Sequence, residues 1–500
     1  MSPGYLTLIT FLPLLGAIVT ALMPKDNLRA IRLTAAGFAF VALVLSVIVW
    51  VQYDTNAAGL QFVEKVPWIP SLGITYFMGV DGLNLPMVVL TTLLTFLAIL
   101  ASWHITLRTK FYFALLLLLE MGIVGVFTSL DLLLFFLFWE VELIPMYLLI
   151  IIWGGPRREY AAIKFVLYTI AGSALMLAGI LALYFFADAN VSGRTFDLLE
   201  LAKTNYALKY GPVFSSVVFF LLILGFLIKL PSFPFHTWLP DAHVEAPTAV
   251  SVILAGVLLK MGGYAIIRIN ASILPQALHD WAYVLAIMAV ISVIYGACTS
   301  MVQNDLKKMV AYSSVSHMGY VLLGIAALTP ASMNGAVLQM FTHGTITGML
   351  FLLVGVIYDK THTRLISEFG GLAARMPLYA TLFVMGGLAS LGLPGMSGFV
   401  AEFTVFVGSY LNPNMQLFTI IAAAGIVITA GYIMWMLQRV FFGPLVQKWQ
   451  HIEDARGIEV VPLVVLVVII IAVGVYPALV TNVIGGGVAP VMANFTKAGL

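Results

Sequence analysis

The sequence predicts an all-α integral membrane protein with about fourteen transmembrane helices. Of its 500 residues, 62% are hydrophobic and only 9% are charged, and the mean hydropathy is +1.05, well outside the range of soluble domains. Apolar runs of about eighteen residues or more recur along the whole chain, and inside lipid only helices and closed barrels satisfy their own backbone hydrogen bonds. The hydrophobicity is continuous rather than alternating, which favours helices.

The apolar stretches divide the chain into spans. The first, from Tyr5 to Met23, has no basic segment before it and no A-x-A cleavage site, so we expect it to be retained as a helix. The stretch 377–411 is too long for one straight span and contains Leu393-Pro394-Gly395, which predicts a broken helix. The last helix is expected to end near Thr481, so no long lateral helix is expected after it. The expected spans are 5–23, 31–52, 80–103, 112–129, 131–153, 160–187, 211–230, 243–268, 277–300, 306–327, 332–357, 377–411, 415–440 and 459–483.

The basic residues predict the orientation. Most of the 24 Lys and Arg residues fall in the loops after helices 1, 3, 5, 9, 11 and 13, including Lys307 in the loop before helix 10. Loops rich in Lys and Arg stay on the cytoplasmic side. Both termini are therefore expected on the outer, periplasmic side. Three basic residues, Lys164, Lys229 and Lys260, fall inside apolar helices instead.

A weak internal repeat predicts two related blocks. The segments 164–177 and 339–352 share small and apolar positions, and helices 7 and 12 both contain a Leu-Pro break, at Leu230-Pro231 and Leu393-Pro394. Helices 4–8 and 9–13 would form two five-helix blocks, and an odd number of spans forces the second block to insert upside down. Inverted repeats with discontinuous helices are typical of ion transporters. The expected domains are 1–107, 108–272, 273–442 and 443–500.

Several function classes are disfavoured. The net charge of +2 gives no basic field for nucleic acid, and no Gly-rich phosphate loop is present. The single cysteine, Cys298, cannot form an internal disulfide or hold an iron–sulfur cluster or a structural zinc. We expect no metal or cofactor in this chain.

Charged residues inside apolar helices predict ion transport. A charge at the bilayer centre costs about 2.5–3.5 kcal/mol on insertion scales and is usually paired, hydrated or functional. Helix 5 carries Glu140 and Glu142, which point about 200° apart on a helix; helix 7 ends with Lys229 beside a proline, and helix 8 carries Lys260. A Glu–Lys pair can change its protonation state when one partner is displaced.

The second block continues this series. His317, His343 and Glu402 lie on three different predicted helices, and histidine can relay protons near neutral pH. Glu120, Glu142 and Lys164 are secondary candidates, and Glu120 and Lys164 lie nearer predicted helix ends, where a side chain can reach the interface. The alternative for each residue is a structural ion pair. The number of such residues favours a path that moves protons, or sodium ions.

Three segments resemble a known family. They are FWEVELIPMY at 138–147, LIKLPSFPFHTWLPDAHVEAPTAVSVILAGVLLKMGGY at 227–264 and NDLKKMVAYSSVSHMGY at 304–320. They are similar to the antiporter-like membrane subunits of respiratory complex I, NADH:quinone oxidoreductase, and the likeness covers nearly the whole chain. The segment GVDGLNLPMVVLTTLL at 79–94, the expected lack of a lateral C-terminal helix and Glu402 in helix 12 resemble the M subunits of that family.

The resemblance implies roles for the buried residues. Glu140 would pair with Lys229 and tune its pKa, Lys229 would pass a proton to Lys260, and His317 and His343 would carry it towards Glu402 for release outside. Glu142 is a further carboxylate that is not present in every family member. The chain would be a non-redox, proton-translocating subunit without a catalytic centre of its own.

The resemblance also implies partners and a location. The L and N subunits would lie on either side, in the bacterial inner membrane, and NADH, FMN, iron–sulfur clusters and quinone would be bound by partner subunits. Large subunits of multisubunit Na⁺/H⁺ antiporters and of membrane-bound hydrogenases share the same motifs. A subunit of either assembly is therefore an alternative, and so is a membrane subunit whose ion pairs only set helix packing.

Overall fold

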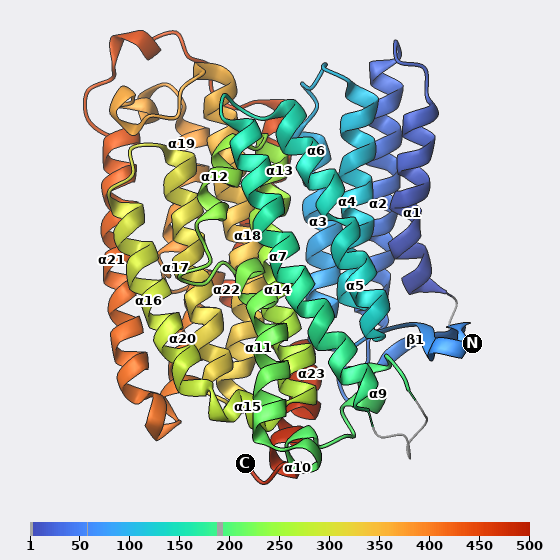
Figure 1. The fold of residues 1–500 in the computed structure, drawn as a ribbon. Helices are drawn as coiled ribbons and strands as arrows, with labels where there is room; N and C mark the ends of the chain where they lie inside the picture. Colours follow the sequence, from blue (N-terminus) through green and yellow to red (C-terminus); the bar gives the residue numbers. More distant parts are fainter. Residues whose placement is uncertain (1–3, 58, 188–193) are drawn as a thin grey trace.

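A bundle of long apolar helices makes up most of the protein (Figure 1). The computed structural model describes residues 4–57, 59–187 and 194–500. Residues 1–3, 58 and 188–193, which fall in the first two expected domains, lie outside the described residues. Within the described ranges, thirteen helices are long and apolar enough to cross a membrane, and α3 (Leu85–Ala101) and α19 (Pro377–Ser390) are shorter apolar helices. The predicted all-α membrane fold is confirmed.

The N-terminal part contains a hairpin that the sequence analysis did not predict. Between α2 and α3, strands β1 and β2 pair antiparallel around Gly73, whose φ of 66° is readily adopted only by glycine. The Glu64 carboxylate of β1 accepts a hydrogen bond from the Leu6 backbone N–H (2.8 Å) at the start of α1. The predicted span 80–103 therefore began too early, because its first residue is still strand. The elements are α1 (Tyr5–Leu22), α2 (Leu28–Gln52), β1 (Gln61–Ile69) and β2 (Ile74–Val80).

The first predicted five-helix block contains the break expected in helix 7. Helix α11 ends at Lys229, and the chain then makes turns through Leu230-Pro231 before α12 begins. Predicted helix 5 is also divided, into α5 and α6, at Glu142. The elements are α4 (Thr109–Thr128), α5 (Leu132–Val141), α6 (Leu143–Trp153), α7 (Arg158–Phe185), the short α9 (Leu198–Leu201) and α10 (Tyr206–Tyr210), α11 (Pro212–Lys229) and α12 (Trp238–Glu245).

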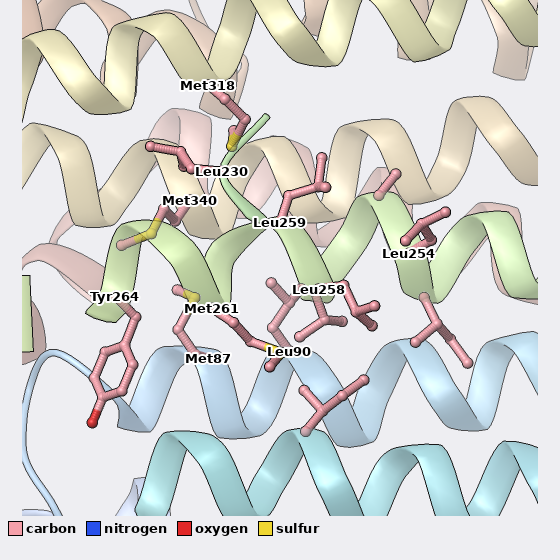
Figure 2. Packing of buried hydrophobic residues seen from close by; sticks show 14 of the residues in the cluster. Met87, Leu90, Leu230, Leu254, Leu258, Leu259, Met261, Tyr264, Met318 and Met340 are labelled. Carbon is pink, nitrogen blue, oxygen red and sulfur yellow. The ribbon is translucent and has the colours of Figure 1, made fainter. Parts of the chain in front are cut away.

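A continuous helical run that is buried from Ala249 onward lies at the centre of the bundle. It consists of α13 (Thr248–Ile253), a π-helical segment (Leu254–Leu258), α14 (Leu259–Ala265) and a second π-helical segment (Ile266–Ala271). Figure 2 shows Leu and Met side chains of α14 and its neighbours packed around this run. The predicted start at 243 was wrong, because Pro247 lacks a backbone N–H and separates α12 from α13.

The second predicted block contains the other broken helix. Within the predicted span 377–411, α19 ends at Ser390 and α20 begins at Ser397, so the break at Leu393-Pro394 is confirmed. The inverted relation of the two blocks and the domain boundaries stay predictions. The elements are α15 (Pro275–Asp280), α16 (Ala282–Met301), α17 (Leu306–Ala326), α18 (Pro330–Thr361), α19 (Pro377–Ser390), α20 (Ser397–Tyr410) and α21 (Gln416–Phe441).

The C-terminal region is longer and more helical than expected. The predicted span 459–483 is in fact the helix α22 (Val460–Val475) followed by α23 (Ala478–Lys497). Tyr476 precedes Pro477 and has non-helical torsions (φ −130°, ψ 75°), in keeping with the clash that disfavours helical torsions before proline, so the helix is interrupted there. The prediction that the last helix ends near Thr481 was wrong, because α23 continues to Lys497. The sequence analysis missed α23 because its small residues lower its hydropathy to 1.4, against 3.1 for α22.

The two ends of the bundle separate the loops as the basic residues predicted. At one end Arg32 donates to the Ile105 carbonyl (3.1 Å) and Arg364 pairs with Asp305 (3.3 Å). At the other end Lys65 pairs with Asp197 (2.6 Å). Figure 1 shows the start of α1 and the end of α23 at this second end. Its assignment to the periplasmic side stays a prediction.

Candidate functional site

A buried ion pair joins the end of α11 to the break between α5 and α6. Lys229 is the last residue of α11 and is 1% exposed, and its ammonium contacts the carboxylate of Glu142, which is fully buried. The rings of Trp139 and Phe165 lie 5.3 and 5.6 Å from the Lys229 nitrogen. Aromatic faces attract a cation and exclude water from it. This pair is therefore enclosed by apolar side chains.

The partner of Lys229 differs from the predicted one. Glu142, not Glu140, forms the pair, because the helix is interrupted at Glu142 and a glycine, Gly122, lets the backbone of α4 approach that point. A Cβ atom on Gly122 would lie 3.2 Å from both the Cβ and the backbone nitrogen of Glu142. Glu140 is half-buried, and one of its carboxylate oxygens is buried without a hydrogen-bond partner among the described residues.

Lys260 contacts two acceptors at the centre of the bundle. It follows the π-helical segment Leu254–Leu258, and its ammonium donates to the carbonyl of Ala255. The wider π turn shifts carbonyls away from their α-helical partners, and such segments are frequent at functional sites. The Lys260 nitrogen also lies 2.7 Å from Nδ1 of His343 on α18. An ammonium can only donate, so a charged Lys260 requires His343 to accept at Nδ1 and to carry its proton at Nε2.

A second contact joins α17 to α20. Nδ1 of His317 lies 3.0 Å from Oε1 of Glu402, and both side chains are buried. On the other side of the ring, Nε2 of His317 lies 3.4 Å from the Ser390 hydroxyl, at the end of α19. A Cβ atom on Gly392, which has a φ of 79°, would lie 3.0 Å from the Glu402 carboxylate. The break between α19 and α20 therefore provides the space that this carboxylate occupies.

These two contacts meet at a small cavity. The rings of His317 and His343 are 5.5 Å apart between centroids. The cavity between them is also lined by Gln339, Ser390 and Glu402. The structure therefore brings four predicted residues into one line, in the order Lys260, His343, His317 and Glu402, across helices α14, α18, α17 and α20.

The Glu142–Lys229 pair is separate from that line. Among the described residues no hydrogen bond or ion pair connects it to Lys260. The helices that carry the two lysines are nevertheless in direct contact, because a Cβ atom on Gly262 would lie 2.5 Å from the Phe226 carbonyl oxygen. The site thus consists of an ion pair in the first block and a four-residue line that begins in the first block and ends in the second.

The secondary candidates lie apart from this line. Glu120 is not near a helix end, as was predicted, but fully buried in the middle of α4, and neither carboxylate oxygen has a hydrogen-bond partner among the described residues. The prediction was wrong because α4 extends to Thr109. Lys164 pairs with Asp241 of α12 at 2.8 Å, and both are partly exposed. Lys164 therefore belongs to a surface ion pair.

The sequence analysis missed several buried basic residues, among them His243 and Lys307. His243 on α12 is fully buried, neither ring nitrogen has a hydrogen-bond partner among the described residues, and its ring stacks on Phe351 at 4.6 Å. Lys307 was assigned to a cytoplasmic loop, but it is 4% exposed and donates to the Ala246 carbonyl. The start of α17 at Leu306 agrees with the predicted span 306–327, and the assignment was wrong because the Lys307 side chain, in the first turn of α17, turns inwards to the Ala246 carbonyl. The Pro-Asp-Ala-His stretch at 240–243 was a sequence signal for His243. It lies in α12, the helix that follows the break after Lys229.

The chain is similar to known proteins along most of its length. Residues 129–429 match the family model of transmembrane proteins described as "NADH:quinone oxidoreductase/Mrp antiporter, TM". A protein of Synechococcus elongatus named NAD(P)H-quinone oxidoreductase chain 4 is 46% identical over 96% of this chain and 90% of its own length. The protein named likewise from Gloeobacter violaceus is 43% identical, with the same coverage.

Solved structures share the fold. A chain of respiratory complex I from Thermus thermophilus with bound NADH is 28% identical, covers 97% of this chain and 99% of its own length, and has a TM-score of 0.86. A chain of the Mrp complex from Dietzia is 23% identical, covers 100% of this chain and 99% of its own, and also has a TM-score of 0.86. At that identity the likeness concerns the fold alone.

Proposed function

Since the chain belongs to the NADH:quinone oxidoreductase/Mrp antiporter family of membrane proteins, we propose that it translocates protons as a membrane subunit of an NAD(P)H:quinone oxidoreductase. It is a multi-pass membrane protein, and its relatives in the family are named as chain 4 of such enzymes. The observation that carries the proposal is the series of four ionisable side chains from Lys260 to Glu402, in which two polar contacts are separated by a distance of 5.5 Å between the histidine ring centroids. Four such groups close together inside a membrane bundle are expected at a proton relay.

The geometry supports a stepwise transfer along this series. Lys260 gives its proton to Nδ1 of His343 over 2.7 Å, and His343 releases the proton from its other nitrogen. The cavity between the rings carries it to His317, with Ser390 and Gln339 as further polar walls that can hold a bridging water. His317 then delivers a proton from Nδ1 to Glu402 over 3.0 Å. Glu402 releases it towards the outer side.

The Glu142–Lys229 pair is proposed to control this series. Separating the pair would leave the Lys229 ammonium without its counter-ion in an apolar, aromatic environment. Burial of this kind disfavours the charged form of an amine. Because α11 and α14 touch at Gly262, a change in the charge or position of Lys229 acts on the neighbourhood of Lys260. The role is the one predicted for Glu140, now transferred to Glu142.

The energy for transfer is proposed to come from partner subunits. This chain would be a non-redox translocase without its own catalytic centre, and NADH or NADPH, FMN, iron–sulfur clusters and quinone would be held by other chains. Subunits of the L and N type would lie on either side in a bacterial inner membrane, with both termini on the periplasmic side. The coarser statement, a membrane subunit of an oxidoreductase complex, follows from the relatives.

A subunit of a multisubunit Na⁺/H⁺ antiporter or of a membrane-bound hydrogenase is the alternative. The likeness to the Mrp complex is one of fold, at 23% identity. The chain-4 relatives, at 46% and 43% identity over nearly the whole chain, favour the quinone oxidoreductase.

Two variants of Lys260 test the proposal against a purely structural role. Lys260→Arg keeps the positive charge but cannot give up its proton, and Lys260→Ala loses both. Proton pumping and NADH:quinone turnover are measured on complexes whose assembly is checked by native electrophoresis. We expect both variants to lose pumping. Parental pumping by Lys260→Arg would show that only the charge matters and would overturn the proposal.

A further inference from the structure

A second cavity opens at the end of the bundle where the basic loops gather. It has a volume of about 460 Å³ and lies between the α3–α4 connection, the start of α13, the last turn of α18 and the start of α22. Its lining combines apolar helix surface with His104, Asp359, His362 and Glu459. This cavity is separate from the small cavity between His317 and His343, and none of the residues discussed as a proton relay lines it.

Several ionisable groups lie in the cavity or beside it. Nδ1 of His104 lies 3.8 Å from the Asp359 carboxylate, and the two side chains are 55% and 43% exposed. Beside them, Lys360 pairs with Glu459 at 3.2 Å. Because both side chains of the His104–Asp359 pair are about half-exposed, water reaches the imidazole and the carboxylate directly. The titratable and charged groups around Asp359 are His104, Tyr112, Lys307, Lys360, His362 and Glu459.

The floor of the cavity leads towards the relay. Thr248 and Leu352 line the cavity. Thr248 is also the first residue of the central helical run, 248–271, that carries Lys260. A Cβ atom on Gly355 would overlap the Thr248 side chain, so α13 and α18 are in contact at the floor. Phe351, whose ring stacks on buried His243, lies midway along α18 between Asp359 and His343, about 12 Å of helix from each.

We propose that this cavity is the vestibule through which protons enter the relay, with the His104–Asp359 pair as the collecting group and His243 as the intermediate group on the way to Lys260. The inference rests on the proposed function and on the predicted cytoplasmic position of this end. Each step moves one proton: a water or buffer molecule protonates the His104–Asp359 pair, His243 takes the proton next, and Lys260 receives it.

A proton-collecting pair such as His104–Asp359 matters because free protons are scarce in water. A diffusion-limited rate constant of about 10¹⁰ M⁻¹s⁻¹ delivers roughly 10³ protons per second to one group at pH 7 but only about 10 per second at pH 9. Enzymes commonly turn over at up to about 10³ per second. Proton uptake therefore becomes limiting at alkaline pH, and a pair that gathers protons from the surrounding water raises the rate there.

The chain contains a matched control for the experiment. His279 and Asp280 form a pair of the same chemistry, with Nδ1 3.6 Å from the carboxylate and side chains 52% and 40% exposed, at the opposite end of the bundle. We compare His104→Gln and Asp359→Asn with His279→Gln and Asp280→Asn. Pumping and turnover are measured in inverted membrane vesicles, where the predicted cytoplasmic side faces the medium, from roughly pH 6 to 9.

The expected loss of pumping depends on the pH and on which end of the bundle carries the substitution. Asp359→Asn and His104→Gln should pump at the parental rate near pH 6 and at least about threefold more slowly near pH 9, and imidazole in the medium should restore the rate. The control variants should match the parent at every pH. The proposed entry route is overturned if His104→Gln and Asp359→Asn pump like the control variants at every pH. Loss of pumping in Lys260→Arg would still support the proposed function in that case. Parental pumping by Lys260→Arg would instead overturn the proposed function itself.

Discussion

Replacing each of the two neighbouring carboxylates of helix 5 by glutamine tests the site at its most specific point. Glu142 is fully buried and pairs with Lys229, whereas Glu140 is half-buried and outside that pair. Glutamine keeps the size of the side chain and removes the charge. Glu142→Gln therefore leaves the Lys229 ammonium without its counter-ion among Trp139 and Phe165. Glu140→Gln leaves the pair intact.

The size of the effect follows from the burial of the pair. Removing one partner of a buried ion pair costs about 3–5 kcal/mol, because an uncompensated charge stays buried. A loss of this size is expected to lower both the melting temperature and the yield of assembled complex. For Glu140→Gln we expect a stability change of less than about 1 kcal/mol.

The assay combines turnover, pumping and assembly. NADH:quinone turnover and the quenching of a pH-sensitive dye are measured in inverted vesicles, and the amount of complete complex is determined by native electrophoresis. We expect Glu142→Gln to lose most pumping and Glu140→Gln to keep at least about half of it. The double variant Glu142→Gln/Lys229→Met removes both charges, so it should assemble better than Glu142→Gln but still not pump. The reasoning is refuted if Glu140→Gln stops pumping while Glu142→Gln pumps like the parent.

Three further changes are predicted to act at defined points. Glu402→Gln removes the acceptor that lies 3.0 Å from His317, so pumping should fall by about tenfold or more with assembly unchanged; parental pumping would exclude Glu402 from the path. Gly122→Ala places a methyl group 3.2 Å from Glu142, and we expect a loss of about 1–3 kcal/mol by thermal unfolding together with slower pumping; an unchanged melting temperature would contradict the close contact. Asp81→Asn breaks the buried 2.5 Å pair with Arg268, so the complex should unfold at a lower temperature, by about 3–5 kcal/mol of stability, and any complex that does assemble should still pump.

The sequence by itself determined the features that depend on local chemistry. Continuous apolar runs predicted a helical membrane protein, because each span must bury its own backbone in lipid. The breaks after Lys229 and around Pro394 were predictable, since proline removes a backbone donor wherever it stands. Lys260, His317, His343 and Glu402 were predictable as members of one site, because charged and imidazole groups in apolar helices are rare and have to face the bundle interior.

Only the tertiary structure decided which groups meet. The choice of Glu142 over Glu140 depends on the interruption of helix 5 and on Gly122 in a neighbouring helix, and neither leaves a periodic pattern in the chain. The burial of His243 and Lys307 was hidden in the same way, because it depends on how α12 and the first turn of α17 pack against other parts of the bundle. A pair such as Lys164 and Asp241 forms between segments far apart in sequence. Hydrophobicity and proline act through the residues beside them, whereas an ion pair depends on how separate helices turn towards each other.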